Sequence, residues 1–370
     1  MQSKLCEMFG IDVPIFAFSH CRDVVVEVSK AGGLGVLGMA RMHPDRVESE
    51  LSWIDEHIEG KPYGIDVLMP SRIDDVSERK LDLDTLIPDE HLGFVRDLLD
   101  KAGVPPLPPG EEAQLKREIL KGINFTPSES LAMVETAMRH PIKVIVNALG
   151  PPPPQLTARA HAQGIKVGAL AGKPRHAERH KAAGCDFVVA VGHEAGGHTG
   201  EITSMVLWPS IVDAVAPLPV LGAGGVGRGR QMAAAFVLGC EGVWTGSLWL
   251  KTLQSEVIPE IKQKMFEAQA TDSVWTKTVT GKPCRTLRNA FSSAYEQPGA
   301  PATLPAPTQN YLWWQEGRTR VERVRAKDFL TYPVGQVVGD MQAEISVRDV
   351  FYDLLTELVE SKERLDHILD

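Results

Sequence analysis

Short apolar runs alternate with amphipathic segments over the first two thirds of the chain. The runs are rich in valine, isoleucine and leucine, which is typical of parallel strands buried on both faces. In the segments between them, apolar residues recur every three or four positions and predict helices. The predicted strands are 14–18, 34–38, 63–69, 142–147, 166–170, 187–191, 220–222 and 242–245. Eight strands, most of them followed by a helix, predict an α/β fold of the (β/α)8 TIM-barrel type.

Two segments depart from this alternation. Residues 70–122, after the third strand, are charged and carry helical patterns over 91–101 and 111–120. We predict a helical insertion there, which forms either a lid or subunit contact over the barrel mouth or a solvated surface excursion. From Thr252 onward the alternation stops, and we predict a helical lobe after strand 8. The predicted domains are a barrel over 1–251 that includes the insertion, a helical substrate lobe over 252–332, and a C-terminal segment over 333–370 that packs back on the barrel.

Charge and composition exclude several classes of protein. The net charge of −9 argues against binding to nucleic acids or to anionic membranes. The five cysteines are scattered singly, which supports neither a disulfide framework nor a zinc site, and we predict no metal. No apolar run approaches the roughly 20 residues that cross a bilayer, and the first residues lack the apolar stretch of a signal peptide. We therefore expect a cytoplasmic protein.

A loop rich in glycine and histidine follows the sixth predicted strand. Residues 192–200 read Gly-His-Glu-Ala-Gly-Gly-His-Thr-Gly. Glycines allow the backbone to approach a ligand closely, and imidazoles transfer protons near neutral pH. Because the carboxyl ends of barrel strands carry active sites, this loop predicts an enzyme. We favour His198 as the catalytic group over His193, and we interpret Glu194 as an orienting hydrogen-bond acceptor.

A second glycine-rich element follows the seventh strand. The strand at 220–222 runs into Gly-Ala-Gly-Gly at 222–225 and then into a helix, and Gly246-Ser247 follows the next strand. Backbone N–H groups at such positions bind anions, and the loops after barrel strands 7 and 8 commonly hold a phosphate. We therefore predict a ligand with one terminal phosphate, such as flavin mononucleotide (FMN).

Together these motifs resemble the nitronate monooxygenase family, formerly called 2-nitropropane dioxygenases. The resemblance covers most of the chain and includes residues 31–35, 194–200, 222–226, 281–289 and 335–339. It implies a non-covalent FMN cofactor and places His198 beside the flavin. It also implies a set of cofactor-binding residues: Asp66, Asp186, Gly196, Gly197, Gly224, Gly225, Gly246, Ser247, Gln336 and Gly339.

The chain departs from the family pattern at two places near the implied flavin. Many members have Gln-Ala-Pro-Met after the first strand, where this chain has Ala-Phe-Ser-His at 17–20. Many have asparagine in the third strand, where this chain has Asp66. His20 and Asp66 are each either a satisfied polar group or a substrate contact. If both face the flavin, we expect an acid/base pair in which the pKa of His20 is raised and that of Asp66 is lowered.

The leading functional hypothesis is oxidation of alkyl nitronates by O2, with His198 as base or charge stabiliser. An alternative is an NAD(P)H-dependent flavin reductase that acts on an enoyl thioester or a quinone. A further alternative is a barrel that binds a phosphorylated metabolite without redox chemistry. The expected partner is a small-molecule substrate, with NAD(P)H and a homodimer left open.

Overall fold

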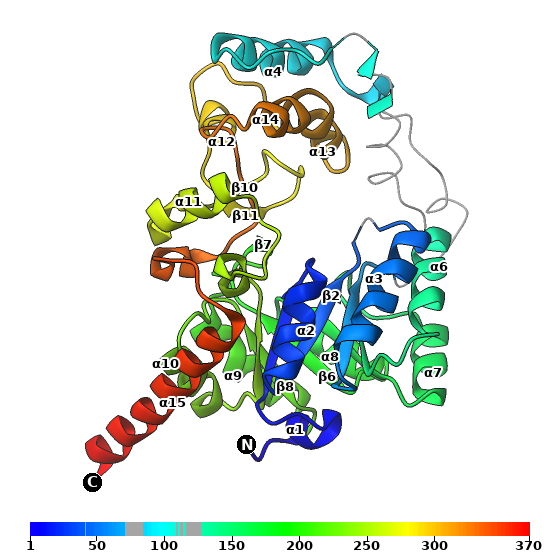
Figure 1. Ribbon diagram of the computed structural model, residues 1–370, viewed down its shortest axis with the longest axis vertical. Coiled ribbons are helices and arrows are strands. Elements are labelled where there is room, and N and C mark those ends of the chain that lie inside the picture. Colours follow the sequence, from blue (N-terminus) through cyan, green and yellow to red (C-terminus); the bar gives the residue numbers. More distant parts are fainter. Residues whose placement is uncertain (41, 71–83, 109, 112–113, 116–126) are drawn as a thin grey trace.

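Eight parallel strands form a closed barrel at the centre of the molecule (Figure 1). The computed structural model describes residues 1–40, 42–70, 84–108, 110–111, 114–115 and 127–370. The barrel strands are β1 (Ile15–Ser19), β2 (Leu34–Gly38), β3 (Tyr63–Val67), β4 (Val144–Asn147), β5 (Lys166–Ala171), β6 (Phe187–Val191), β8 (Val220–Ala223) and β9 (Gly242–Thr245). The predicted TIM barrel is confirmed, and each predicted strand end lies within two residues of the observed one.

Helices follow the barrel strands and surround them. They are α2 (Arg22–Lys30), α3 (Pro44–His57), α6 (Pro127–Ala137), α7 (Pro154–Ala162), α8 (Pro174–Ala182), α9 (Ser204–Val215) and α10 (Gly229–Val237). The short helix α1 (Lys4–Phe9) closes the amino-terminal end, where the Phe9 ring packs edge-on against Phe16 and Phe187. Ligands therefore reach this barrel from the carboxyl ends of its strands, as is usual for the fold.

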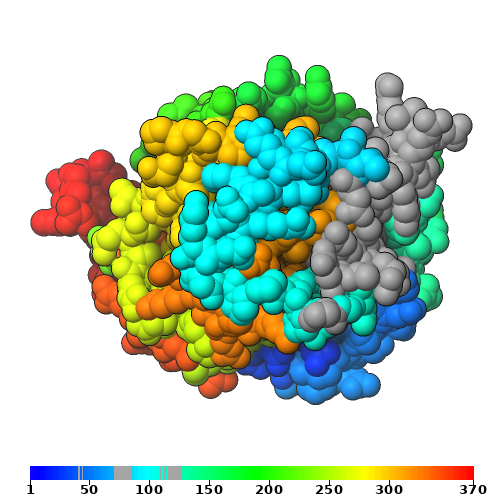
Figure 2. All heavy atoms as spheres, turned by 90° about the horizontal axis from the view of Figure 1, so that it is seen from above, coloured from blue at the N-terminus to red at the C-terminus, as the bar shows by residue number. Residues whose placement is uncertain are grey.

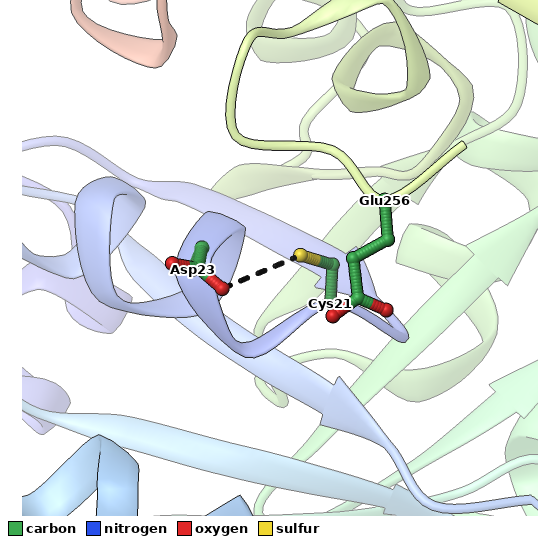
Figure 3. A group of neighbouring side chains, drawn as sticks. All are labelled: Cys21, Asp23 and Glu256. Carbon is green, nitrogen blue, oxygen red and sulfur yellow. Dashed lines mark hydrogen bonds between the residues drawn. The ribbon is translucent and has the colours of Figure 1, made fainter. Parts of the chain in front are cut away.

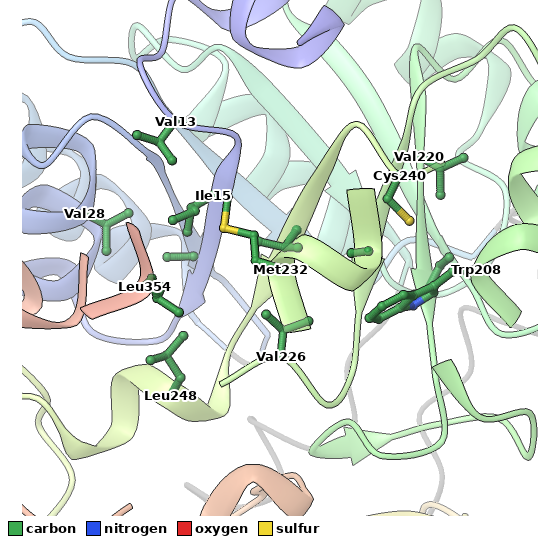
Figure 4. Close-up of a cluster of buried hydrophobic side chains, with 14 of the residues drawn as sticks. Val13, Ile15, Val28, Trp208, Val220, Val226, Met232, Cys240, Leu248 and Leu354 are labelled. Atoms are coloured by element: carbon green, nitrogen blue, oxygen red, sulfur yellow. The ribbon is translucent and has the colours of Figure 1, made fainter. Parts of the chain in front are cut away.

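The C-terminal helix α15 (Val347–Leu369) takes the place of the eighth barrel helix. It packs against α10 on one side and α2 on the other. Leu354 of α15 shares a buried cluster with Met232 of α10 and Ile15 of β1 (Figure 4). Gly229 allows the close approach of α10, because a Cβ there would lie 2.2 Å from the Leu354 carbonyl oxygen.

A lobe follows β9 and lies beyond the carboxyl ends of the strands (Figure 1). Its helical elements are η2 (Ser247–Lys251), α11 (Pro259–Glu267), η3 (Ala270–Asp272), α12 (Ala290–Ala294), α13 (Thr308–Leu312), the π-helical turn η4 (Trp313–Arg318), α14 (Thr319–Val324) and η5 (Gln336–Asp340). Tyr311, Leu312 and Trp313 are fully or almost fully buried in its core. The predicted helical lobe after strand 8 is confirmed.

The insertion after β3 packs on this lobe. Its described part comprises η1 (Asp84–Leu86) and α4 (Asp89–Lys101), which covers the end of the lobe (Figure 1). Val95 and Leu99 of α4 are buried in the lobe core. Arg96 donates two hydrogen bonds to the buried Glu316 carboxylate, at 2.8 and 2.9 Å. These contacts exclude a solvated excursion for this part, and most of the helix predicted over 111–120 lies outside the described residues.

The lobe also contains a small antiparallel sheet that the sequence did not predict. Its strands are β10 (Ser273–Thr276), β11 (Cys284–Leu287) and β7 (Gly197–His198), in the order β10-β11-β7. The strands are only two to four residues long and show no clear alternation of apolar and polar residues. This sheet joins the glycine–histidine loop to the lobe.

No helix in the described ranges combines the length and the apolar composition that crossing a bilayer requires.

Candidate active site

The lobe and the insertion lie over the barrel mouth. Seen from above, the region of α4 covers the middle of this face, with late segments of the chain around it (Figure 2). The glycine–histidine loop, the glycine turn after β8 and the end of β9 all leave the barrel beneath them. The predicted motifs are thus brought to one end of the barrel.

Glu194 organises the glycine–histidine loop from within. Its carboxylate accepts hydrogen bonds from the backbone N–H of Ser204 at 3.0 Å and from the Ser204 hydroxyl at 3.0 Å. Ser204 begins α9, so the carboxylate satisfies a free N–H at the start of that helix. Glu194 is therefore an acceptor that fixes the loop, as the sequence suggested.

His198 lies in β7, and its ring contacts Thr280. His198 Nε2 is 3.0 Å from Thr280 Oγ1, and the Thr280 hydroxyl donates to the Lys282 carbonyl oxygen at 2.9 Å. Because that hydroxyl hydrogen is already used, Oγ1 accepts from Nε2–H of His198. This arrangement assigns the hydrogen of the neutral ring to Nε2 and makes Nδ1 the basic nitrogen.

Thr280 is therefore expected to set the tautomer of His198. Removing its hydroxyl in Thr280→Val should shift the tautomer ratio about 2- to 10-fold, which is the effect of one lost hydrogen bond. Thr280→Ser keeps the hydroxyl and should keep the wild-type ratio. Long-range proton–nitrogen NMR spectra of the His198 ring measure this ratio directly. An unchanged ratio in Thr280→Val would show that another contact decides the tautomer.

His193 is held by the loop that contains it. Its Nδ1 lies 2.8 Å from the carbonyl oxygen of Gly200, which can only accept, so Nδ1 carries the hydrogen. The ring packs edge-on against Trp275 of β10 at 5.1 Å. The buried Arg285 of β11 donates from Nε to the His193 carbonyl oxygen at 3.0 Å and from Nη1 to that of Ser273 at 2.7 Å. These bonds tie the loop to the small sheet.

His20, directly after β1, and Asp66 of β3 reach the mouth on either side of β2 but do not form the expected pair. The His20 ring donates from Nδ1 to the carbonyl oxygen of Gly38 at 2.8 Å. Asp66, beside Gly38 in the sheet register, is 5% exposed, and its Oδ2 has no hydrogen-bond partner among the described residues. Burial raises the pKa of Asp66 well above its ordinary value, so the predicted lowering is wrong.

Two glycines after β8 form a turn with left-handed backbone. Gly224 has a φ of +92° and Gly225 a φ of +73°. A Cβ at Gly224 would lie 2.9 Å from the carbonyl oxygen of Gly192, so the turn packs directly on the glycine–histidine loop. Ser204 Oγ also lies 2.8 Å from the Gly224 carbonyl oxygen, so its one hydrogen is shared between that oxygen and the Glu194 carboxylate.

Unpaired backbone N–H groups gather at the ends of β8 and β9. Within the described residues, no protein acceptor is bonded to the N–H of Gly224, Gly225, Gly246 or Ser247. Such groups need a partner, and an anion is a suitable one. These four residues are thus fitted to hold a phosphate.

The start of α10 is capped from within the chain. The Gln231 side-chain oxygen accepts from the N–H of Gly227 at 2.7 Å and from that of Arg228 at 2.9 Å. Arg228 and Arg230 both form ion pairs with Glu357 of α15, at 2.7 and 2.6 Å. The anion-binding groups are therefore those before the helix, and the two arginines serve the α10–α15 contact.

Residues 335–339, a late segment rich in glycine, cross from the loop after β9 to the glycine–histidine loop. The backbone N–H of Gly335 donates to Ser247 Oγ at 2.8 Å, and the backbone N–H of Gln336 donates to the Glu194 carbonyl oxygen at 3.0 Å. A Cβ at Gly196 would lie 2.8 Å from Gly335 N, so close approach explains both glycines. Gly339 instead packs on η3, where its Cβ would lie 2.8 Å from the N of Ala270.

Asp186 does not fit the cofactor role that the resemblance implied. It precedes β6, at the amino end of the barrel strands. Its carboxylate bonds His161 Nε2 at 2.8 Å, Lys166 Nζ at 3.2 Å and the N–H of Val167 at 2.8 Å. The residue joins β5 to β6 at the end of the barrel opposite the mouth.

Cys21, Asp23 and Glu256 form a group with metal-ligand atoms within 4.8 Å of one another (Figure 3). The Cys21 thiol donates to the carbonyl oxygen of Gln254 at 3.0 Å. Burial raises the pKa of this thiol, whereas a metal requires the thiolate. The group is therefore explained by hydrogen bonding between α2 and the segment after η2.

Comparison with known proteins identifies the family. The model of the nitronate monooxygenase family matches residues 2–357. The chain belongs to this family. It is 43% identical over 378 residues to a Mycobacterium tuberculosis protein, Rv1533, whose name assigns it to the monooxygenases, and the match covers 100% of both chains.

Solved structures share the fold over nearly the whole chain. Nitroalkane oxidase from Streptomyces ansochromogenes has a TM-score of 0.76 at 23% identity and covers 97% of this chain and 99% of its own. FabK from Thermotoga maritima has a TM-score of 0.71 at 22% identity and covers 100% and 99%. The predicted membership of the nitronate monooxygenase family is confirmed, and the chain is an oxidoreductase enzyme of that family.

Sequence reasoning missed Thr280 and gave Arg285 no definite role. Both lie in or next to the late motif at 281–289, but their partners, His198 and His193, are more than 80 residues earlier. The pairing of β7 with β11 brings these residues and their partners together, and no periodic pattern in the sequence predicts that pairing.

Proposed function

We propose that this protein is an FMN-dependent nitronate monooxygenase that oxidises alkyl nitronates with O2. The observation that carries the proposal is the set of four backbone N–H groups at the ends of β8 and β9 that have no acceptor among the described residues. It lies in a chain of the nitronate monooxygenase family, and a loop with two histidines packs on it. A phosphate group at this place is what FMN would supply.

Residues of four segments would hold the cofactor. Gly224, Gly225, Gly246 and Ser247 would bind the phosphate through backbone N–H groups, with the Ser247 hydroxyl as a further donor. Gly196 and Gly197 of the glycine–histidine loop, Gln336 of the crossing segment and Asp66 of β3 would surround the ring, and Gly339 would hold that segment in position. When bound, the flavin would supply the redox chemistry, and the protein would provide orientation and charge.

His198 would act on the substrate. An alkyl nitronate is an anion, so a protonated imidazole would hold it and stabilise its charge. With a neutral nitroalkane, Nδ1 would instead remove the proton on the carbon next to the nitro group, because Nε2 is bonded to Thr280. We propose His193 and His20 as secondary candidates, since each ring is held through Nδ1 by a backbone carbonyl oxygen.

The proposed setting is the cytoplasm, with a small molecule as the partner. The net charge of −9 does not favour nucleic acids or anionic lipids. NAD(P)H is not required for nitronate oxidation, and the assay below includes it as the competing donor.

Reconstitution with FMN followed by oxygen-electrode assays tests this function. The purified protein should retain FMN after desalting and should consume O2 when propionate nitronate or another alkyl nitronate is added. NADH should cause much slower consumption. Rapid oxidation of NADH with no response to any nitronate would favour the reductase. Failure to bind FMN at all would favour a barrel without redox chemistry.

A further inference from the structure

Asp66 faces the inside of the barrel at the level where the strands end. Tyr63, Ile65 and Val67 of β3 pack outward on the surrounding helices. Side chains alternate along a strand, so Asp66 and Gly64 face the barrel interior. A Cβ at Gly64 would indeed strike the interior residue Val144. Asp66 is therefore the last interior side chain of β3.

The described surroundings of Asp66 offer its buried Oδ2 no hydrogen-bond partner. The neighbouring strands place Gly38 of β2 and the apolar Val146 of β4 beside it in register. The rings of Phe18 of β1 and of the titratable His20, which follows β1, lie over Gly38. Oδ2 is buried and bonded to none of the described residues.

A buried carboxyl group in this position is stable in its neutral form. Ionisation without a partner has a large desolvation cost, which is why burial alone raises the pKa of Asp66. The neutral acid, unlike the carboxylate, carries an O–H that can donate. A buried donor without an acceptor is rare, so a ligand at the barrel mouth is the expected acceptor.

We propose that Asp66 is a protonated carboxylic acid that donates a hydrogen bond to the flavin ring and makes flavin binding pH-dependent. This inference rests on the proposed function. Where many members of the family carry asparagine, the amide would donate at every pH. Asp66 donates only while it holds its proton.

The direction of the pH dependence follows from this chemistry. As pH rises through the raised pKa of Asp66, the O–H is lost and a negative charge appears beneath the ring. FMN affinity should therefore fall with rising pH. Stability of the apoprotein should fall as pH rises from about 3.8, the ordinary pKa of Asp66 in the unfolded chain, to the raised pKa in the folded chain, because over that interval only the folded chain holds the proton.

FMN titrations of the wild type, Asp66→Asn and Asp66→Ala measure the effect. Quenching of flavin fluorescence gives the dissociation constant across a range of pH values on both sides of neutrality. Wild-type affinity should fall about tenfold or more across this range, and that of Asp66→Asn should not. Asp66→Ala should be independent of pH and about 3- to 10-fold weaker than Asp66→Asn.

Infrared spectra of the apoprotein test the protonation state without FMN. At neutral pH the wild type should show the C=O band of a protonated carboxylic acid, and Asp66→Asn should lack it. The absence of this band, or an unchanged pH profile in Asp66→Asn, would overturn the role of Asp66 and leave the FMN proposal intact. Failure of the wild type to bind FMN at any pH would overturn both.

Discussion

Replacing Gly225 with alanine is expected to weaken FMN binding about 10- to 100-fold or more. Gly225 has a φ of +73°, and its N–H is one of the four at the ends of β8 and β9 that lack an acceptor within the described part of the chain. An added Cβ would come no closer than 3.6 Å to the protein, at Glu194, so the protein itself has room for it. The methyl group would instead occupy space that we assign to the phosphate. Loss of one charge-assisted hydrogen bond, about 1.5–3 kcal/mol, gives the expected magnitude.

Gly164 provides a matched control. It has the same φ of +73°, nothing lies within 4 Å of a Cβ built on it, and it lies between α7 and β5 at the amino end of the barrel. Both alanine variants should lose similar stability, roughly 1–2 kcal/mol from the left-handed backbone. Gly164→Ala should bind FMN like the wild type, as measured by fluorescence titration. Equal FMN affinity in the two variants would remove Gly225 from the phosphate site.

Replacing His198 with alanine is expected to lower kcat/KM for nitronates about 10²- to 10⁴-fold, the usual contribution of a general acid or base. The ring is positioned by Thr280 from the lobe side and takes no part in the proposed phosphate site. FMN content, measured by absorbance, should therefore stay at the wild-type level.

The control for this variant removes an imidazole at the opposite end of the barrel. His161 bonds Asp186 there and is exposed, so His161→Ala should keep wild-type turnover. A His198→Ala enzyme within about threefold of the wild type would contradict the assignment. If His193→Ala then showed the large loss, the two histidines of the loop would have to exchange roles.

The barrel could be predicted from the sequence because its signals are local. Each strand is a compact apolar run, and each following helix shows its own periodicity. The lobe is different, because β7 has two residues and pairs with β11 more than 80 positions later. The sequence predicted that the C-terminal segment packs back on the barrel, but the place of α15 between α10 and α2 depends on contacts between distant parts of the chain.

The sequence predicted the positions of the glycine-rich backbone segments better than the contacts of the side chains. The glycine turn, Ser247 and the late glycine motif meet as expected, because left-handed or closely packed glycines leave a direct sequence signal. Side-chain roles were less predictable. Asp186 lies at the wrong end of the barrel, and His20 bonds a carbonyl oxygen instead of Asp66. The isolation of Asp66 results from its neighbours Gly38 and Val146, which belong to other strands.

Anaerobic mixing of the FMN-loaded protein with an alkyl nitronate distinguishes nitronate oxidation from NADH-dependent reduction. The flavin absorbance should bleach rapidly on mixing with nitronate, return when O2 is admitted, and change only slowly with NADH. Rapid bleaching by NADH, with none by nitronate, would show that the protein is a reductase and not a nitronate monooxygenase.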